Sequence, residues 1–143
     1  MEKPVIFLDK GARDVGLAEM MFNLIRQNLE QNPEKIKGFN SLDAKVIIEA
    51  RDIQIIVGLE FEQGRLTVSK GFSPKPDLHI ISDSETILAL CLLKIKFGLP
   101  YFFDANGFKV LKKLLTRELI IKGLLSHFPA LVKLTKVFSV VRN

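Results

Sequence analysis

The most restrictive feature of this sequence is a run of seven residues, from Ile87 to Leu93, that contains no polar side chain. Ser82 and Glu85 stand just before it with the S-x-x-E spacing of a capping box, which predicts that a helix begins there. A helix that is apolar all round must be buried on every side. In a small domain we therefore expect one side of this helix to face another helix or an apolar ligand.

Length and composition favour one folded domain. The chain has 143 residues, of which 48% are hydrophobic and 26% are charged. We expect residues 1–143 to form a single domain, with residues 1–13 as a short N-terminal extension. A membrane-spanning helix needs about 20 apolar residues, and the first residues lack the apolar stretch of a secretory signal. These features predict a soluble, cytoplasmic protein.

Few side chains suit catalysis or metal binding. Cys91 is the only cysteine, and its place inside the apolar helix favours a buried, inert thiol. Because the chain has only two histidines, we expect neither a metal site nor a cofactor. Asp77 and His79 share one face of a predicted strand and could pair as a base and its orienting group, but a polar outer face explains them better. We therefore expect no enzymatic activity.

The charges divide unevenly along the chain. Residues 1–88 hold 11 basic and 14 acidic side chains, whereas residues 89–143 hold 10 basic and two acidic ones. A basic face of this kind suits anionic lipid head groups, nucleic acid or an acidic partner, and it also serves as an ordinary solvated surface. The sequence contains no glycine-rich phosphate loop and no nucleic-acid motif, so we expect no nucleic-acid partner.

The first half of the chain predicts a helix followed by strands. Apolar residues recur at helical spacing from Asp14, a possible cap, to Leu29, and Pro33 ends the helix. From residue 42 the apolar period changes to two. Strands are predicted over residues 45–49, 54–62, 65–70 and 77–81, with a tight turn at Gln63 and Gly64. This order predicts an antiparallel meander.

The second half combines short apolar elements with a cluster of aromatic residues. Five of the 12 aromatic side chains fall within residues 97–108, on a segment that Gly98 and Pro100 interrupt. Helices are predicted over residues 106–115 and 127–141, with a fifth strand over 118–123 between them. Such elements, packed with the apolar helix against one sheet, can enclose a hydrophobic pocket.

The order of these elements resembles the sterol carrier protein type-2 domain. The resemblance is carried by four segments: the Gln63-Gly64 turn with residues 65–68, the strand 76–80, the polar start and apolar helix of 84–90, and the strand 119–123. It implies an α/β fold of the α+β type, with a five-stranded, mostly antiparallel sheet, covering helices and a hydrophobic tunnel. The chain departs from the family in lacking tryptophan and in its longer, more aromatic segment 96–108.

The resemblance also implies a function without catalysis. It implies binding or transfer of a fatty acid, fatty acyl-CoA, phospholipid, sterol or isoprenoid in an apolar tunnel. The alternative is an interaction module of a lipid or ubiquinone biosynthesis complex, with its pocket closed. We expect the tunnel to be lined by Ile87, Leu90, Cys91, Phe97, Leu99, Phe102, Phe103, Phe108, Leu111, Phe128, Leu131, Leu134 and Phe138. We expect Lys112, Lys113, Lys133 and Lys136 to meet an anionic head group, a membrane surface or a protein partner.

Overall fold

The alternating apolar and polar residues of the first half form three long neighbouring strands in the computed structural model. These are β2 (Ala44–Ala50), β3 (Ile55–Glu62) and β4 (Arg65–Lys70), paired antiparallel as predicted. Gln63 and Gly64, both with positive φ, form the turn between β3 and β4. The structure describes residues 4–12, 15–71, 75–96 and 99–139.

Three further strands complete a sheet of six, in the order β1-β4-β3-β2-β5-β8. They are β1 (Val5–Leu8), β5 (Leu78–Ser82) and β8 (Ile120–Lys122). The predicted meander is wrong for β5, which pairs parallel to β2 and not with β4. The strand count is also larger than the predicted five, because β1 pairs parallel to β4 at one edge. The mixed α+β class is confirmed.

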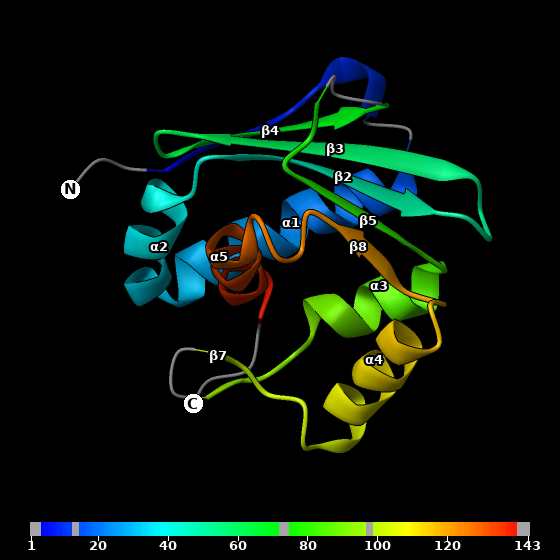
Figure 1. Cartoon of the computed structure of the whole chain (residues 1–143). Coiled ribbons are helices and arrows are strands. Elements are labelled where there is room, and N and C mark those ends of the chain that lie inside the picture. Colours follow the sequence, from blue (N-terminus) through cyan, green and yellow to red (C-terminus); the bar gives the residue numbers. More distant parts are fainter. Residues whose placement is uncertain (1–3, 13–14, 72–74, 97–98, 140–143) are drawn as a thin grey trace.

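The main helices cover one face of this sheet (Figure 1). α1 and α5 pack against each other beneath the strands, and α4 packs against α3 at the side farthest from the sheet (Figure 1). The helices are α1 (Gly16–Gln31), α2 (Ile36–Ser41), α3 (Ser84–Cys91), α4 (Ala105–Leu115) and α5 (Phe128–Phe138), with 3-10 turns at Lys10–Ala12 and Pro33–Lys35. β6 (Ile95–Lys96) and β7 (Leu99–Pro100) form a separate small ribbon.

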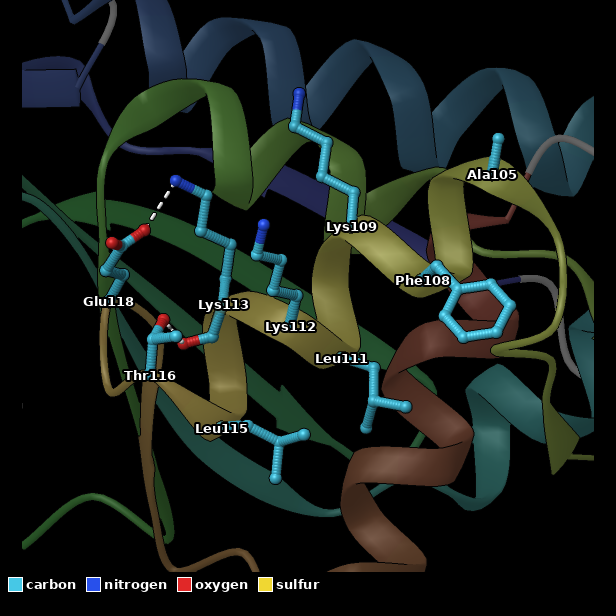
Figure 2. Close-up of a pocket in the computed structure, with 9 residues that line it drawn as sticks. All are labelled: Ala105, Phe108, Lys109, Leu111, Lys112, Lys113, Leu115, Thr116 and Glu118. Atoms are coloured by element: carbon cyan, nitrogen blue, oxygen red, sulfur yellow. Dashed lines mark hydrogen bonds and ion pairs between the residues drawn. The ribbon is translucent and has the colours of Figure 1, made fainter.

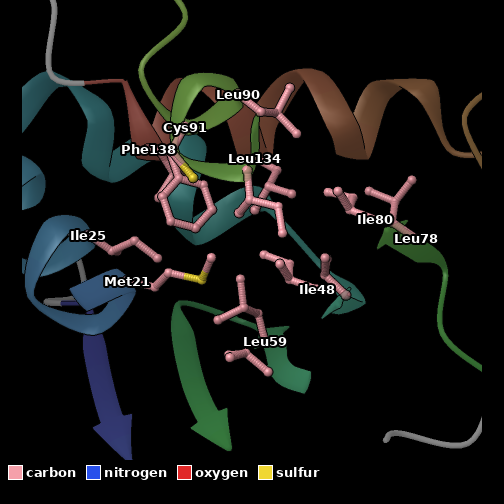
Figure 3. Packing of buried hydrophobic residues seen from close by; sticks show 14 of the residues in the cluster. Met21, Ile25, Ile48, Leu59, Leu78, Ile80, Leu90, Cys91, Leu134 and Phe138 are labelled. Atoms are coloured by element: carbon pink, nitrogen blue, oxygen red, sulfur yellow. The ribbon is translucent and has the colours of Figure 1, made fainter. Parts of the chain in front are cut away.

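A hydrophobic core lies between the sheet and the helices. Met21 and Ile25 of α1 reach it from one side, and Ile48 of β2 from the sheet (Figure 3). Leu134 and Phe138 of α5 fill the space between them (Figure 3). All five side chains are buried, so α1, α5 and the sheet form one packed unit.

The start of α3 differs from the predicted capping box. The cap is Asp83, whose Oδ1 accepts from the Thr86 amide at 2.7 Å. This hydrogen bond lowers the pKa of Asp83. Ser82 instead donates its hydroxyl to the Glu118 carbonyl at 2.7 Å, which ties the end of β5 to the segment before β8. The predicted cap at Asp14 lies outside the described residues.

Two polar side chains from the first half of the chain hold the end of α5. Asn28 of α1 is buried, and its Nδ2 donates to the carbonyls of Val137 at 2.9 Å and Phe138 at 2.7 Å. The Lys35 ammonium group donates to the carbonyl of Lys136, 3.0 Å away, and also to that of Ser139. Partial burial lowers the pKa of Lys35. These bonds satisfy carbonyls that the last turn of a helix leaves without partners.

Candidate functional site

An apolar cavity of about 330 Å³ lies on the side of α3 and α5 that faces away from the sheet. Side chains of α3, α4, α5, β8 and the β7 region form its wall. The lining residues are Leu90, Leu93, Leu99, Phe102, Val110, Leu111, Leu114, Leu119, Ile121, Leu124, Leu125, Phe128, Leu131, Val132 and Thr135. Its volume is at the lower end of the range for small-molecule sites, about 300–1,000 Å³.

The wall offers almost no hydrogen-bonding group to a ligand. Thr135 has the only polar side chain among the described lining residues, and its hydroxyl donates to the Val132 carbonyl at 2.8 Å. Water in such a space would lack the two to four polar partners that it needs. The cavity therefore suits a hydrocarbon chain and disfavours a polar substrate.

The cavity reaches the protein surface. Leu125, in the turn before α5, is 91% exposed, while Leu99 and Phe128 are about half exposed. Leu90, Leu93 and Leu119 are buried and form its floor. The exposed part of the cavity wall is therefore apolar.

The predicted lining residues that the structure describes fall into three groups. Six of them line this cavity: Leu90, Leu99, Phe102, Leu111, Phe128 and Leu131. Ile87, Cys91, Leu134 and Phe138 pack instead around a gap of about 10 Å³ on the sheet side of α3 and α5, which is too small for a lipid. Phe103 and Phe108 lie on the outer surface, and Phe97 lies outside the described residues.

The rotation of α4 explains why several lining residues were missed. Gly107 packs so closely that an added Cβ would lie 2.5 Å from the Tyr101 carbonyl oxygen and from the Phe102 Cα. The packed face of α4 therefore continues from Gly107 through Val110 and Leu114, which the sequence pattern did not single out. The sequence signal for this packed face was Gly107 itself, which stands three residues before Val110 and so on the same side of the helix.

Cys91 lies in the core on the sheet side of α3, and its burial raises the pKa of the thiol to about 12. At neutral pH the thiolate fraction is negligible, so the native thiol should not react with iodoacetamide. Unfolding should expose it and add one carbamidomethyl group. Counting the labels by mass spectrometry, with and without denaturant, checks this. Rapid labelling of the native protein would contradict the burial of Cys91.

The structure separates the two residues that could have formed a catalytic pair. His79 Nε2 lies 3.1 Å from Glu49 Oε1 on the neighbouring strand. Asp77 Oδ1 lies 3.4 Å from His127 Nε2, while its Oδ2 accepts from the Lys45 amide at 2.8 Å.

Among the described residues, no group of three or more histidine, cysteine or acidic side chains could hold a metal ion. No described helix is long and apolar enough to cross a membrane.

The four lysines expected to meet anionic groups lie on two different surfaces. Lys112 and Lys113 lie along a groove on the outer face of α4 (Figure 2). Lys133 and Lys136 belong to α5 next to α2, where the Lys133 ammonium group donates to the Ser41 carbonyl at 3.2 Å.

Comparison with known proteins shows likeness in structure alone. The sequence matches no family model and no curated protein. A solved structure described as a UbiJ-SCP2 ubiquinone synthesis protein aligns over 86% of this chain and 96% of its own, at 14% identity and a TM-score of 0.59. A crystal structure of sterol carrier protein 2 aligns over 84% and 94%, at 15% identity and a TM-score of 0.50. The chain therefore has the SCP2-like fold.

Proposed function

We propose that this protein binds a long apolar ligand, such as a fatty acyl or isoprenoid chain, and carries it without chemical change. The observation that carries the proposal is the apolar cavity, whose single polar lining side chain in the described structure is already hydrogen-bonded internally. The names of the similar structures, sterol carrier protein 2 and a ubiquinone synthesis protein, support a ligand of this class.

Burial of hydrocarbon is the main source of free energy for such binding. Each buried methylene contributes about 0.8 kcal/mol, so about ten methylenes give about 8 kcal/mol before the entropy cost of association. The entropy cost lowers the net free energy of binding below this value, so the affinity is weaker than the micromolar dissociation constant that about 8 kcal/mol alone would give. No charged or hydrogen-bonding contact inside the cavity is needed.

A bulky substitution in the cavity wall tests this function. Replacing half-buried Leu124 with tryptophan should fill part of the cavity and weaken binding of a fluorescent fatty acid at least tenfold. The matched control is Leu24→Trp, at an equally half-buried leucine of α1 away from the cavity. Circular dichroism and thermal unfolding test whether both variants fold.

Co-purified ligand gives a second, independent measurement. Native mass spectrometry followed by denaturing extraction should release a stoichiometric acyl, sterol or isoprenoid compound. Equal fatty-acid affinity of the two tryptophan variants would contradict the placement of the site. A protein that purifies empty and ignores fatty acid, acyl-CoA, phospholipid and quinone would contradict the function.

A second candidate is an accessory subunit that binds a protein of lipid or ubiquinone biosynthesis. The likeness to a structure described as a ubiquinone synthesis protein favours it. The two functions differ in one measurable respect, because only the carrier takes up free lipid in the absence of any other protein.

A further inference from the structure

Large apolar side chains are exposed to solvent both at the cavity and along the neighbouring outer face of α4. Phe103 is 73% exposed, Leu115 76% and Leu125 91%. With Phe108, Phe128 and the partly buried Leu111 they form what we name the apolar rim. Exposed leucine and phenylalanine at this density mark an interaction site in a water-soluble domain.

The apolar rim is continuous from the segment before α4 along the outer face of that helix. The Phe103 ring meets the Tyr101 ring at a centroid distance of 5.8 Å and the Phe108 ring at 6.2 Å, both edge to face. Phe108, Leu111 and Leu115 then follow one another along α4 (Figure 2). Leu111 lines both the inner cavity and the outer groove of about 650 Å³, so the two spaces share a wall.

Lysines lie along the other side of the same helix. Lys109, Lys112 and Lys113 extend from α4 beside the apolar stripe (Figure 2). Lys109 pairs with Glu85 at 2.6 Å and Lys113 with Glu118 at 2.5 Å, and both pairs are solvent-exposed. Lys112 has no ion pair within the described part of the chain. The helix therefore presents an apolar stripe next to a basic one.

We propose that α4 and the apolar rim dock onto the surface of an anionic lipid bilayer. A helix with phenylalanine and leucine on one side and lysines on the other lies in the bilayer interface, with its apolar side at the boundary of the acyl chains. Lysines close to an anionic surface each add attraction. This deepens the proposed function and rests on it, because docking in this orientation places the cavity mouth where an acyl chain can enter without crossing water.

The charges on this surface favour a bilayer over a second copy of the chain. A symmetric contact through the same patch brings the lysines of both copies together. An anionic bilayer instead supplies both the negative head groups and the apolar layer that the two stripes need. Attraction between exposed charges also weakens as salt is added, which gives the docking a measurable signature.

Vesicle co-sedimentation tests the docking with the full-length protein. The wild-type protein should sediment with vesicles of phosphatidylcholine and phosphatidylserine at low salt, and much less with phosphatidylcholine alone. Neutralising the three lysines of α4, as Lys109→Gln, Lys112→Gln and Lys113→Gln, should weaken binding about a hundredfold, which corresponds to about 3 kcal/mol. The control triple variant carries glutamine at Lys37, Lys45 and Lys70, which are exposed on α2, β2 and β4.

The apolar contribution is tested separately, at positions outside the cavity wall. Phe108→Ser with Leu115→Ser should weaken vesicle binding at least tenfold, while fatty-acid affinity without vesicles stays unchanged. This readout separates failure of the docking from failure of the proposed function. Three results would overturn the docking: no sedimentation of the wild type, equal losses in the two lysine triples, or a dimer in solution that the serine variant dissociates.

Discussion

Replacing Gly123 with alanine should destabilise the protein by about 3 kcal/mol or more. Gly123 has a φ of +89°, a conformation that costs an L-residue about 1–2 kcal/mol. An added Cβ would also lie 2.1 Å from the Asp77 carbonyl oxygen, far closer than contact allows. To relieve this overlap, β8 has to move away from β5, with loss of their pairing. Urea unfolding measures the change in the free energy of unfolding.

The same substitution should weaken ligand binding, because Gly123 joins β8 to the segment that carries Leu124 and Leu125 of the cavity wall. Gly38→Ala is the matched control. It lies in α2 with nothing within 4 Å of an added Cβ, and should stabilise the protein by about 0.4–1 kcal/mol. If Gly123→Ala unfolds at the same urea concentration as the wild type, the close packing of β8 against Asp77 is incorrect.

Replacing Asn28 with alanine should cost about 2–4 kcal/mol. The change leaves the carbonyls of Val137 and Phe138 buried without their shared donor, and an unpaired buried polar group costs about 1–3 kcal/mol. Thermal and urea unfolding measure the loss. Asn28→Asp should be at least as harmful, since an ionised carboxylate cannot donate to a carbonyl.

The comparison for this position is Asn23 of the same helix, whose Oδ1 accepts from the Arg26 guanidinium at the surface. Asn23→Ala should change the free energy of unfolding by about 0.5 kcal/mol or less. Equal effects at the two asparagines would show that the contact between α1 and the end of α5 contributes little to stability.

The strands from β2 to β5 were predictable from the sequence, but the strand β1 and the neighbours of β5 were not. β2, β3 and β4 alternate apolar and polar residues and are joined by short turns, so both their existence and their antiparallel pairing were predictable. The apolar period of β5 shows that it is a strand and says nothing about its neighbour. Its parallel pairing with β2 follows from the path of the connection after β4, which periodicity does not encode.

The sequence indicated some features around the candidate cavity more accurately than others. The uniformly apolar helix correctly indicated that α3 is almost enclosed, with Leu88 as its most exposed apolar residue at 39%. The aromatic residues of 97–108 gave a less accurate guide, because Phe103 and Phe108 project to the surface. Aromatic side chains occur both in cores and at interfaces, so their presence alone does not show which way they point. For Phe108, the direction follows from the rotation of α4, which the close packing of Gly107 sets.

α3 and α5 separate the hydrophobic core from the cavity, and the packing on their two sides differs in how much empty volume it leaves. Toward the sheet the packing leaves a gap of about 10 Å³, whereas toward α4 it leaves about 330 Å³. Substitutions on the α4 side can therefore alter the shape of the cavity while the packed side keeps the domain folded. Proteins with this fold could diverge in ligand preference through the segment from β6 to α4 alone. A designer could exchange that segment to change the ligand, because it lines the cavity and contributes no strand to the six-stranded sheet.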